Sequence, residues 1–386
     1  MKTADALALL RVPLIAALLV SMCACGSENP IGNAPSSVDG PIGEQAPDSE
    51  VDPNVIDGEQ WPGVGWKTTD AESLGLNPLG IDRARDYAFA PGRNTQALLI
   101  VYRGQLVGEW YAQGYSKTSA VTSWSIAKSF LSVLFGIALD QGLYASLDEP
   151  VGQWLPEWAD DARGDITIRQ LLEMQSGLDS SDEDIFSAPY QLAYALDREL
   201  SEQPSWEYAN SDSMVLGRVL EMIVGEEFVS YANTQLLEPL GMTSARWWTD
   251  ASGQAMSYCC IDATPRDFAR FGIMASRMGR WRGTDIVTEA YLQEAYTPQV
   301  AAPWYSLHWW TYNQARANVI SAVGYHDQLI YVFPDHDLTV LRFSLYEHVG
   351  GSSYQLGFTN YMSTEEANDW SGSTFLGHID TMLNLN

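Results

Sequence analysis

The sequence predicts an α+β fold, an α/β arrangement in which an antiparallel sheet flanked by helices is split in the sequence by an inserted all-helical lobe. Two observations support this prediction. Apolar runs suited to strands stand early and late in the chain, and the segment between them has mostly helical periodicity. The chain of 386 residues is also long enough to bury a large core, as one domain or as two interleaved lobes.

The first 25 residues are typical of an export signal. Lys2 and Arg11 come before or at the start of the apolar run Val12–Val20, which is too short to be a comfortable transmembrane helix. Cys25 follows in a setting that resembles a bacterial lipobox, so we expect a lipoprotein lipidated at Cys25, with plain cleavage after Ala24 as the alternative. The predicted location is the periplasmic side of a bacterial membrane, or secretion.

Residues 26–60 predict a disordered acidic tether, because they are rich in Gly, Pro, Ser, Asp and Glu and have almost no apolar periodicity. The whole chain has 49 acidic and 21 basic residues, a formal charge of −28. This charge repels nucleic acid and anionic membrane surfaces. We therefore expect no nucleic-acid partner, and membrane contact only through the lipid anchor. Solubility of the protein is sufficient to explain the excess of acidic residues.

Residues 61–386 predict the folded domain, with the helical lobe at about 125–250. Apolar runs at 96–102 and 106–110 bracket Arg103-Gly104-Gln105 and predict a β-hairpin. Helical periodicity or start signals predict helices at 167–175, 213–224 and 264–278. Later apolar runs predict strands at 307–312, 328–333 and 338–345.

Ser125 and Lys128 carry the strongest chemical signal in the chain. They are three residues apart at the start of a helix that is apolar nearly all round, so both side chains share one face and the amine can take the hydroxyl proton. With Thr122 or Ser123 as the N-cap, Ser125 would occupy the first turn, where unpaired N–H groups favour negative charge. Such short patterns also arise by chance, and Lys128 would then be an ordinary solvated lysine.

Two later segments could complete a site around this pair. In Tyr208-x-Asn210, a tyrosine beside a lysine cation could shuttle a proton, and the carboxamide could hold the amine or a substrate amide. The alternative is a packed aromatic ring beside a turn asparagine. Further on, residues 324–328 lead into a strand whose edge could lend an N–H to an oxyanion hole, with His326 facing the cleft; a lone histidine there is more often structural.

Cysteines and histidines give weaker signals. Cys259 and Cys260 are adjacent, and we expect two buried free thiols, with a vicinal disulfide as the alternative that closes almost no loop. The five histidines show no HExxH motif and no close pairing. We therefore expect neither a metal nor another cofactor.

The order SxxK, YxN and a His-led tripeptide before the last strands resembles the serine β-lactamase and penicillin-binding protein superfamily. The similarity is nearest to the class C-like branch with family VIII carboxylesterases and 6-aminohexanoate-dimer hydrolases. Segments 166–178, 238–242 and 259–272 agree, and the likeness covers roughly residues 70–360. It implies a β-lactamase/transpeptidase-like fold and a serine hydrolase that cleaves small esters or amides through an acyl-enzyme.

The resemblance also implies residue roles. Ser125 would be the acylated nucleophile, Lys128 its base and Tyr208 the proton shuttle to the leaving group. Asn210 would position the reacting groups. The remaining implied contacts are the N–H groups of Ser125 and of Gln328 or Leu329 at the oxyanion, and Tyr190, within 182–194, at the substrate.

The third motif departs from the β-lactamase pattern. Where Lys-Thr/Ser-Gly is usual, this chain has His326-Asp327-Gln328, which removes a cation suited to a β-lactam carboxylate and adds a negative charge. Esters or amides are therefore favoured as substrates. A β-lactamase or D,D-peptidase acting on cell-wall peptides is the alternative enzyme. A non-catalytic wall- or peptide-binding module is the alternative outside enzymes, and the retained Ser, Lys, Tyr and Asn argue against it.

Overall fold

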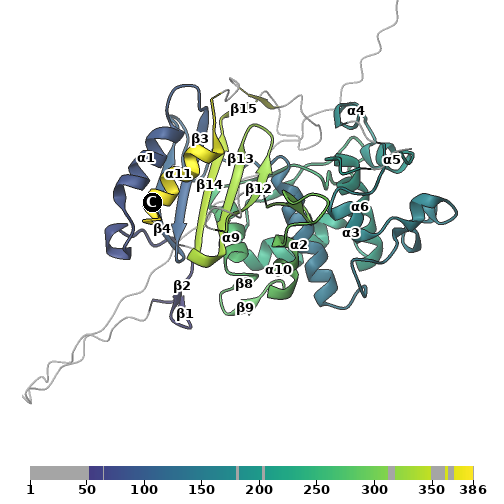
Figure 1. The fold of residues 1–386 in the computed structure, drawn as a ribbon, viewed down its shortest axis with the longest axis horizontal. Helices are drawn as coiled ribbons and strands as arrows, with labels where there is room; N and C mark the ends of the chain where they lie inside the picture. Colours follow the sequence, from purple (N-terminus) through teal and green to yellow (C-terminus); the bar gives the residue numbers. More distant parts are fainter. Residues whose placement is uncertain are drawn as a thin grey trace, which may run out of the picture. The chain divides into compact units, whose positions relative to one another are not determined.

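The computed structural model describes residues 52–63, 65–179, 182–201, 205–311, 318–348, 361–363 and 369–385 (Figure 1). The predicted export signal, Cys25 and most of the predicted tether lie outside these residues. None of the helices within the described ranges combines the length and the apolarity that crossing a bilayer requires.

A seven-stranded antiparallel sheet forms the centre of the folded domain (Figure 1). Its spatial order is β10-β11-β12-β13-β14-β3-β4, so that a strand from the end of the domain pairs with one from its beginning. The strands are β3 (Thr95–Tyr102), β4 (Gln105–Tyr111), β10 (Tyr305–Ser306), β11 (Trp309–Trp310), β12 (Ile320–Gly324), β13 (Gln328–Phe333) and β14 (Leu338–Ser344). The predicted hairpin and the predicted strands at 328–333 and 338–345 are confirmed.

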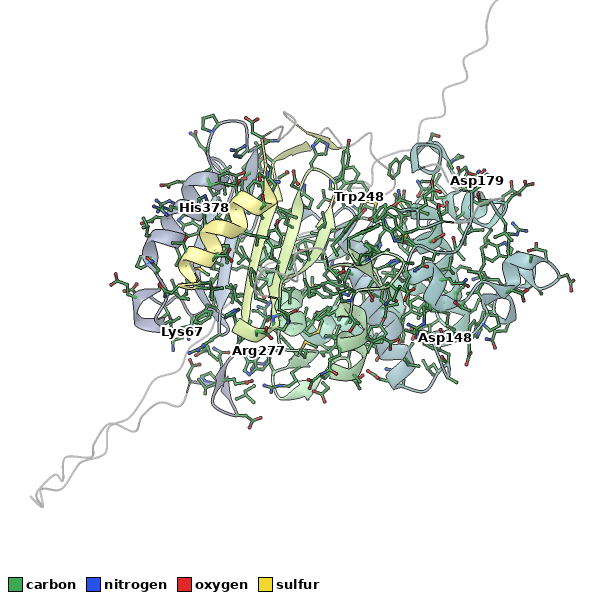
Figure 2. All side chains as sticks on the ribbon, viewed as in Figure 1. Lys67, Asp148, Asp179, Trp248, Arg277 and His378 are labelled. Atoms are coloured by element: carbon green, nitrogen blue, oxygen red, sulfur yellow. A yellow bond between two sulfur atoms is a disulfide. The ribbon has the colours of Figure 1, made fainter. Side chains whose placement is uncertain are left out.

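Helices cover both faces of this sheet because its central strands are apolar on both sides. In β3, the alternate residues Leu98 and Ile100 pack with α1 (Pro78–Ala88) and α11 (Gly372–Met382). Between them, Leu99 and Val101 belong to the second cluster, which contains α2 (Ile126–Asp140) and α9 (Pro265–Ser276). This period of two is what a strand buried on both faces requires. Figure 2 shows the side chains that fill the space between the layers.

The helical lobe lies between β5 (Val121–Thr122) and β6 (Arg246–Trp247), which are joined by β7 (Ile261–Ala263) in a small separate sheet. It begins with α2 and continues through α3 (Ile168–Leu172), α4 (Asp182–Ser187), α5 (Gln191–Leu196), α6 (Asn210–Val224), α7 (Phe228–Ala232), a π-helical turn at Asn233–Leu237 and α8 (Glu238–Leu240). Helix α3 opens with a capping box on Thr167. Helix α9 opens on Thr264 with a proline in its first turn, which is the Thr-Pro start that the sequence predicted. The remaining described elements are α10 (Glu289–Tyr296) and the strand pairs β8 (Arg280–Trp281) with β9 (Thr284–Asp285) and β15 (Tyr346–His348) with β16 (Tyr361–Ser363).

Ordered structure begins before Trp61. Strands β1 (Val55–Ile56) and β2 (Glu59–Gln60) form a short hairpin in residues that the sequence assigned to the tether. Arg277 fixes this hairpin, because its guanidinium lies 4.0 Å from the centre of the Trp61 ring and donates a hydrogen bond to the Gln60 carbonyl. The predicted boundary at residue 60 therefore lies too late in the chain.

The segment predicted as a strand at 307–312 contains the turn and the second strand of a tight hairpin, and residue 312 lies outside the described residues. Strands β10 and β11 pair across Leu307 and His308, whose φ angles are 39° and 66°. A two-residue turn with both φ angles positive is normally signalled by Asn or Gly, and neither stands here. The sequence pattern therefore predicted a continuous strand, because the turn residues lie in an apolar run without a turn signal.

Candidate active site

Ser125 stands at the N-terminal boundary of α2, just after a sharp change in backbone direction. Trp124 has a φ of 47°, in the left-handed region, and Ser125 returns to φ −68° and ψ −3°. The carbonyls of Ser123, Trp124 and Ser125 then accept the first three N–H groups of the helix, from Ile126 at 3.2 Å, Ala127 at 3.1 Å and Lys128 at 3.0 Å. A left-handed tryptophan is unusual, and such backbone often accompanies functional sites.

The predicted N-cap is wrong. Ser123 does not cap α2 because its hydroxyl donates to the Trp124 carbonyl at 2.9 Å and accepts the N–H of Ile261 at 2.7 Å. The Thr122 hydroxyl, also buried, has no hydrogen-bond partner. Ser123 instead ties the residues before α2 to strand β7.

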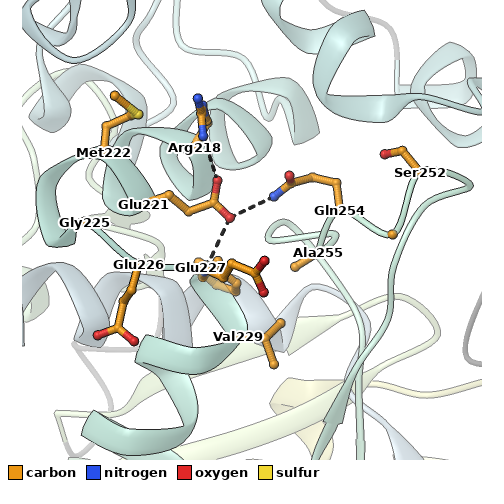
Figure 3. Close-up of a pocket in the computed structure, with 12 residues that line it drawn as sticks. Arg218, Glu221, Met222, Gly225, Glu226, Glu227, Val229, Ser252, Gln254 and Ala255 are labelled. Atoms are coloured by element: carbon orange, nitrogen blue, oxygen red, sulfur yellow. Dashed lines mark hydrogen bonds and ion pairs between the residues drawn. The ribbon is translucent and has the colours of Figure 1, made fainter.

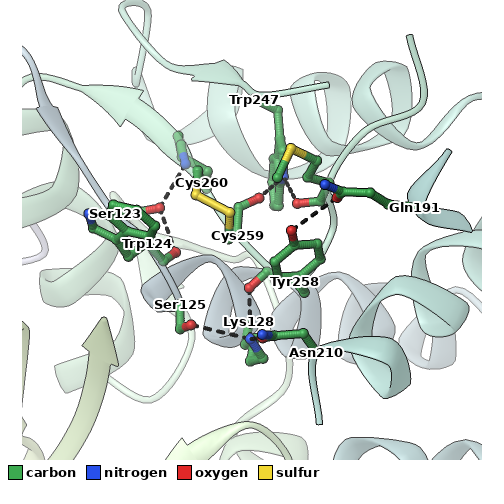
Figure 4. The surroundings of a disulfide bond; sticks show 12 residues. Ser123, Trp124, Ser125, Lys128, Gln191, Asn210, Trp247, Tyr258, Cys259 and Cys260 are labelled. Atoms are coloured by element: carbon green, nitrogen blue, oxygen red, sulfur yellow. Dashed lines mark hydrogen bonds between the residues drawn. A yellow bond between two sulfur atoms is a disulfide. The ribbon is translucent and has the colours of Figure 1, made fainter. Parts of the chain in front are cut away.

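Lys128 is the centre of the arrangement. Its side chain is 1% exposed, and its Nζ donates to Asn210 Oδ1 at 2.6 Å and to the Tyr258 carbonyl at 2.9 Å (Figure 4). The same Nζ lies 3.2 Å from Ser125 Oγ. The structure thus brings together Ser125, Lys128 and Asn210, as the sequence predicted. Tyr258 is an additional member that the sequence reasoning missed, because its contribution is a backbone carbonyl.

The hydrogen-bond inventory around Lys128 shows what this geometry can do. Asn210 Oδ1 and the Tyr258 carbonyl can only accept, so each takes one N–H of the amine. A neutral amine has two N–H groups and one lone pair. In its protonated form the amine donates to Ser125 Oγ at 3.2 Å; once neutral, with its two N–H groups engaged by Asn210 and Tyr258, it has a lone pair left to accept the proton of that hydroxyl. The arrangement therefore suits a lysine that acts as a base toward this serine.

Tyr208 also lies beside the amine. Lys128 Nζ is 4.8 Å from the centre of the Tyr208 ring, which is half-buried just before α6. The ring stacks on Trp310 at 5.7 Å between centroids and meets Tyr305 edge-on at 6.0 Å. The structure thus places Tyr208 beside the lysine, in an aromatic setting that fixes its ring.

A buried polar layer lies behind these residues. Burial raises the pKa of Asp212 to about 8, although the Ser176 hydroxyl donates to its Oδ1 at 2.7 Å. Its other oxygen, Oδ2, has no hydrogen-bond partner. A carboxyl in this setting favours the protonated form at neutral pH.

His308 belongs to the same layer. Its Nε2 lies 3.0 Å from the Ser213 hydroxyl, and its Nδ1 lies 3.3 Å from the Tyr305 hydroxyl. Burial, and after it the charge that Lys128 carries when it is protonated, hold the pKa of His308 well below its usual range. His308 is thus a neutral imidazole that supports the site from behind.

The third motif occupies a different place from the one predicted. Gln328 and Leu329 are in β13, an interior strand paired on both sides, where Leu329 faces Val323 of β12 and Arg342 of β14. The Gln328 side chain is fully buried and joins the Tyr325 carbonyl to the Ser344 N–H. These residues are part of the sheet framework, and their place in an interior strand makes them weak candidates for the predicted backbone donor.

The backbone that approaches the serine segment is the end of β12. A Cβ added to Gly324 would lie 2.3 Å from the Ser123 carbonyl oxygen and 3.0 Å from the Trp124 Cβ. Only glycine permits this approach. The next residue, Tyr325, packs its ring on Trp124 at 5.5 Å. The N–H of Tyr325 is therefore the better placed candidate for the second oxyanion donor.

His326 and Asp327 form the turn that follows. Both have positive φ angles, 57° and 58°, and both of their carbonyls accept from the buried guanidinium of Arg342 at 2.9 Å. Burial raises the pKa of the Asp327 carboxyl, and the charges of Arg342 and His326 oppose that rise. The His326 ring packs against Tyr325 at 4.1 Å, and Tyr325 in turn packs on Trp124 beside the serine.

Tyr190 lies next in sequence to Gln191, which contacts Tyr258 of the site. It precedes α5 with its side chain 59% exposed, while Gln191 is buried and accepts the Tyr258 hydroxyl at 3.0 Å. From the same region, Phe186 packs on the Tyr258 ring at 6.0 Å. The segment predicted to contribute a substrate contact thus meets the site through Gln191 and Phe186.

Cys259 and Cys260 form a disulfide bond, so the expectation of free thiols is wrong (Figure 4). Both side chains are almost completely buried, as expected. Adjacency in sequence does not reveal the backbone geometry that decides whether neighbouring thiols can bond.

A separate polar pocket of about 590 Å³ lies at the C-terminal end of α6 (Figure 3). Asn210 is at the opposite end of this helix, roughly 20 Å away at the usual rise per residue. The Glu221 carboxylate in the pocket is already engaged by Arg218, Gln254 and the Phe228 N–H. This pocket is therefore distinct from the candidate active site. In the described part of the chain, no group of three or more His, Cys, Asp or Glu residues is arranged to hold a metal ion.

Comparison with known proteins agrees with the motifs. The beta-lactamase family profile matches residues 83–351, and the chain therefore belongs to the beta-lactamase family. The 6-aminohexanoate-dimer hydrolase of Paenarthrobacter ureafaciens is 22% identical over 286 residues, which cover 65% of this chain and 72% of that protein. The predicted superfamily is thus confirmed.

Solved structures show the same fold. A candidate 6-aminohexanoate-dimer hydrolase from Bacillus anthracis has a TM-score of 0.63 at 20% identity, covering 76% of this chain and 80% of that chain. A D-stereospecific amidohydrolase from Streptomyces sp. has a TM-score of 0.55 at 20% identity, covering 69% and 93%. The predicted fold class, an antiparallel sheet with helices and a helical lobe of β-lactamase type, is confirmed.

The buried carboxyl of Asp212 predicts a pH-dependent stability. Its pKa is about 8 in the folded protein and near its ordinary value of 3.8 in the unfolded chain, so the folded state loses stability as pH rises from 4 toward 8. Asp212→Asn keeps an acceptor for Ser176 and cannot ionise. We expect the variant to gain on the order of 1–3 kcal/mol relative to wild type between pH 5 and pH 8, measured by urea unfolding. Parallel pH profiles for the two proteins would contradict this.

Proposed function

We propose that this protein is a serine hydrolase that cleaves ester or amide bonds of small, uncharged substrates through an acyl-enzyme on Ser125. One observation carries the proposal: Lys128 is buried with two N–H groups engaged by Asn210 and Tyr258 and with its Nζ 3.2 Å from Ser125 Oγ. Burial makes a lysine costly to keep charged. Lys128 is well suited to accept a proton.

In this mechanism Ser125 Oγ attacks the substrate carbonyl carbon while its proton moves to Lys128 Nζ. The N–H groups of Ser125 and Tyr325 stabilise the negative oxygen that forms. When the bond to the leaving group breaks, Tyr208 relays the proton from Lys128 to the departing oxygen or nitrogen. A water molecule, activated by Lys128 and Tyr208, then hydrolyses the Ser125 ester and restores the free enzyme.

The surroundings of Ser125 favour uncharged substrates with apolar parts. The Trp124 ring contacts Tyr325 at 5.5 Å and Trp248 at 6.3 Å, and the Tyr208 ring beside Lys128 stacks on Trp310. Residues 318–331 contain no lysine or arginine that could fix a substrate carboxylate beside the serine, and Asp327 adds an acid. The names of the relatives, an aminohexanoate-dimer hydrolase and an amidohydrolase, fit the same broad class of acyl transfer.

Replacing the nucleophile tests the mechanism. Ser125→Ala should lower kcat for a short-chain p-nitrophenyl ester by a factor of at least about 10⁴, because no other atom can form the acyl-enzyme. Ser132→Ala is the matched control: it makes the same change on the same helix, where the hydroxyl lies 3.1 Å from the buried Tyr291 hydroxyl. A fluorophosphonate should label the wild-type peptide that contains Ser125. Labelling at another serine would refute the assignment.

Substrate charge provides a second test. An anionic cephalosporin meets no fixed cation in residues 318–331 and lies near Asp327, and like charges at this range disfavour binding by on the order of 1 kcal/mol or more. We expect kcat/KM for a neutral ester to exceed that for a chromogenic cephalosporin. Asp327→Asn tolerates the positive φ and should improve only the cephalosporin, by roughly fivefold. Faster cephalosporin turnover by the native protein would favour the β-lactamase or D,D-peptidase alternative.

We further propose that the chain is exported and anchored through a lipid on Cys25, which the sequence pattern supports. When produced with its leader in a Gram-negative host, the wild-type protein should sediment with membranes, and Cys25→Ser should appear in the soluble periplasmic fraction. Mass spectrometry of the N-terminal peptide provides the direct readout. Equal solubility of the two forms would show that Cys25 is not an anchor.

A further inference from the structure

We propose that the Cys259–Cys260 disulfide is a positioning element of the active site: it fixes the Tyr258 carbonyl that directs the Lys128 amine toward Ser125. The inference rests on the proposed function of Lys128 as the base. It adds a role for a pair of residues that do not themselves touch the reacting atoms.

The disulfide stands between two attachments of one segment to the catalytic helix. Immediately before it, the Tyr258 carbonyl accepts a hydrogen bond from Lys128 Nζ at 2.9 Å. Immediately after it, Ile261 exchanges hydrogen bonds with Ser123, donating its N–H to the hydroxyl at 2.7 Å and accepting the Ser123 N–H at 2.8 Å. The two cysteines therefore set the spacing between a group that holds the base and a group that holds the residues before the nucleophile (Figure 4).

The cysteine backbone is itself anchored on the side away from Lys128. The Cys259 carbonyl accepts the Trp247 indole N–H at 2.8 Å, and the Cys259 N–H donates to Met256 at 3.0 Å. The Cys260 carbonyl accepts the Trp248 N–H at 3.0 Å. The segment is thus held from outside by strand β6 and the residues that follow it, and the disulfide links that support to the active site.

The energetics of such a bond point to a local role. A disulfide stabilises a fold mainly by closing a loop in the unfolded chain, and two adjacent residues close almost none. What the bond does impose is a small ring through the peptide unit between the two residues, which restricts the backbone torsions of both. The direction of the Tyr258 carbonyl relative to Ile261 is then fixed by covalent geometry as well as by packing.

Loss of the disulfide should therefore change the position of the Lys128 amine more than it changes substrate binding. Reduction breaks the S–S bond and places two electrons and two protons on the sulfur atoms, supplied by a dithiol that is itself oxidised to a disulfide. Two non-bonded thiols need more space than a bonded pair in a site where both side chains are at most 1% exposed. The segment has to shift, and the Tyr258 carbonyl is its nearest functional group.

The first experiment establishes the bond in the purified protein. The protein exported to the periplasm is unfolded in denaturant and treated with iodoacetamide, with or without prior dithiothreitol, and the peptide containing both cysteines is analysed by mass spectrometry. We expect alkylation only after reduction. Complete alkylation without reductant would overturn the proposal.

The second experiment measures catalysis by the same sequence in two redox states. Wild-type protein is unfolded and refolded with or without dithiothreitol, and rates are measured with a neutral p-nitrophenyl ester. In the reduced form we expect kcat to fall at least about tenfold while KM changes less than about twofold, because a small displacement of a catalytic group mainly affects the chemical step. Reoxidation should restore kcat. An unchanged kcat, or an effect confined to KM, would overturn the proposal.

Two variants separate positioning from general stability. Cys259→Ala combined with Cys260→Ala should have the low kcat of the reduced protein and should not respond to dithiothreitol. Trp247→Phe is the matched control, because it removes the indole hydrogen bonds to Met256 and Cys259 and keeps a smaller aromatic ring at this position. It should lower the melting temperature and retain at least about half of the wild-type kcat. If the double cysteine variant and Trp247→Phe lose kcat equally, the loss reflects general packing of the segment, and the proposed positioning role is wrong.

The outcome is distinguishable from a failure of the proposed function. If the wild-type protein hydrolyses no ester or amide, or if Ser125→Ala is as active as wild type, the function is wrong. If the wild type is active, Ser125→Ala is inactive and the disulfide-free forms keep full kcat, only the present inference is wrong.

Discussion

The structure depends on keeping one amine buried with its hydrogen bonds satisfied. Lys128 Nζ contacts Ser125 from its own helix, Asn210 from the start of α6 and Tyr258 from the residues before β7. An unsatisfied lysine at this depth would cost several kcal/mol. These three segments therefore have to converge for the fold to tolerate Lys128, and their convergence is also what forms the site.

The sheet and the helical lobe make this convergence rigid. Helix α2 is buried along Ile126–Ala138, so the serine and the lysine stand on an element that packing holds on every side. From the sheet, the end of β12 approaches so closely that Gly324 leaves no room for a side chain against the Ser123 carbonyl. Rigid elements hold reacting groups more precisely than exposed loops do. The neutral His308 and the protonated form of Asp212 that burial favours reinforce this arrangement without adding charge.

Sequence reasoning predicted the parts of this protein that depend on local pattern. Apolar alternation located β3, β13 and β14, and the SxxK and YxN spacings identified Ser125, Lys128, Tyr208 and Asn210, which the structure places together. It failed for the features that are determined by backbone geometry. The left-handed residues Leu307 and His308 carry no turn signal, the carbonyl of Tyr258 has no residue signature, and the approach of Gly324 is a tertiary contact. The third motif was misplaced because a turn of left-handed residues separates the strand beside Ser125 from the strand that contains Gln328.

The order of strands in the sheet has a consequence for how the chain reaches this state. Strand β3 pairs on one side with its neighbour in sequence, β4, and on the other with β14, which is synthesised only after the entire helical lobe. Until β14 arrives, the β3–β4 hairpin presents an open apolar edge, and such edges are prone to pair with other chains. Contacts this distant in sequence also slow folding. Because β3 and β14 are so far apart in sequence, the edge of β3 stays open to pairing with other copies of the chain until β14 has been synthesised.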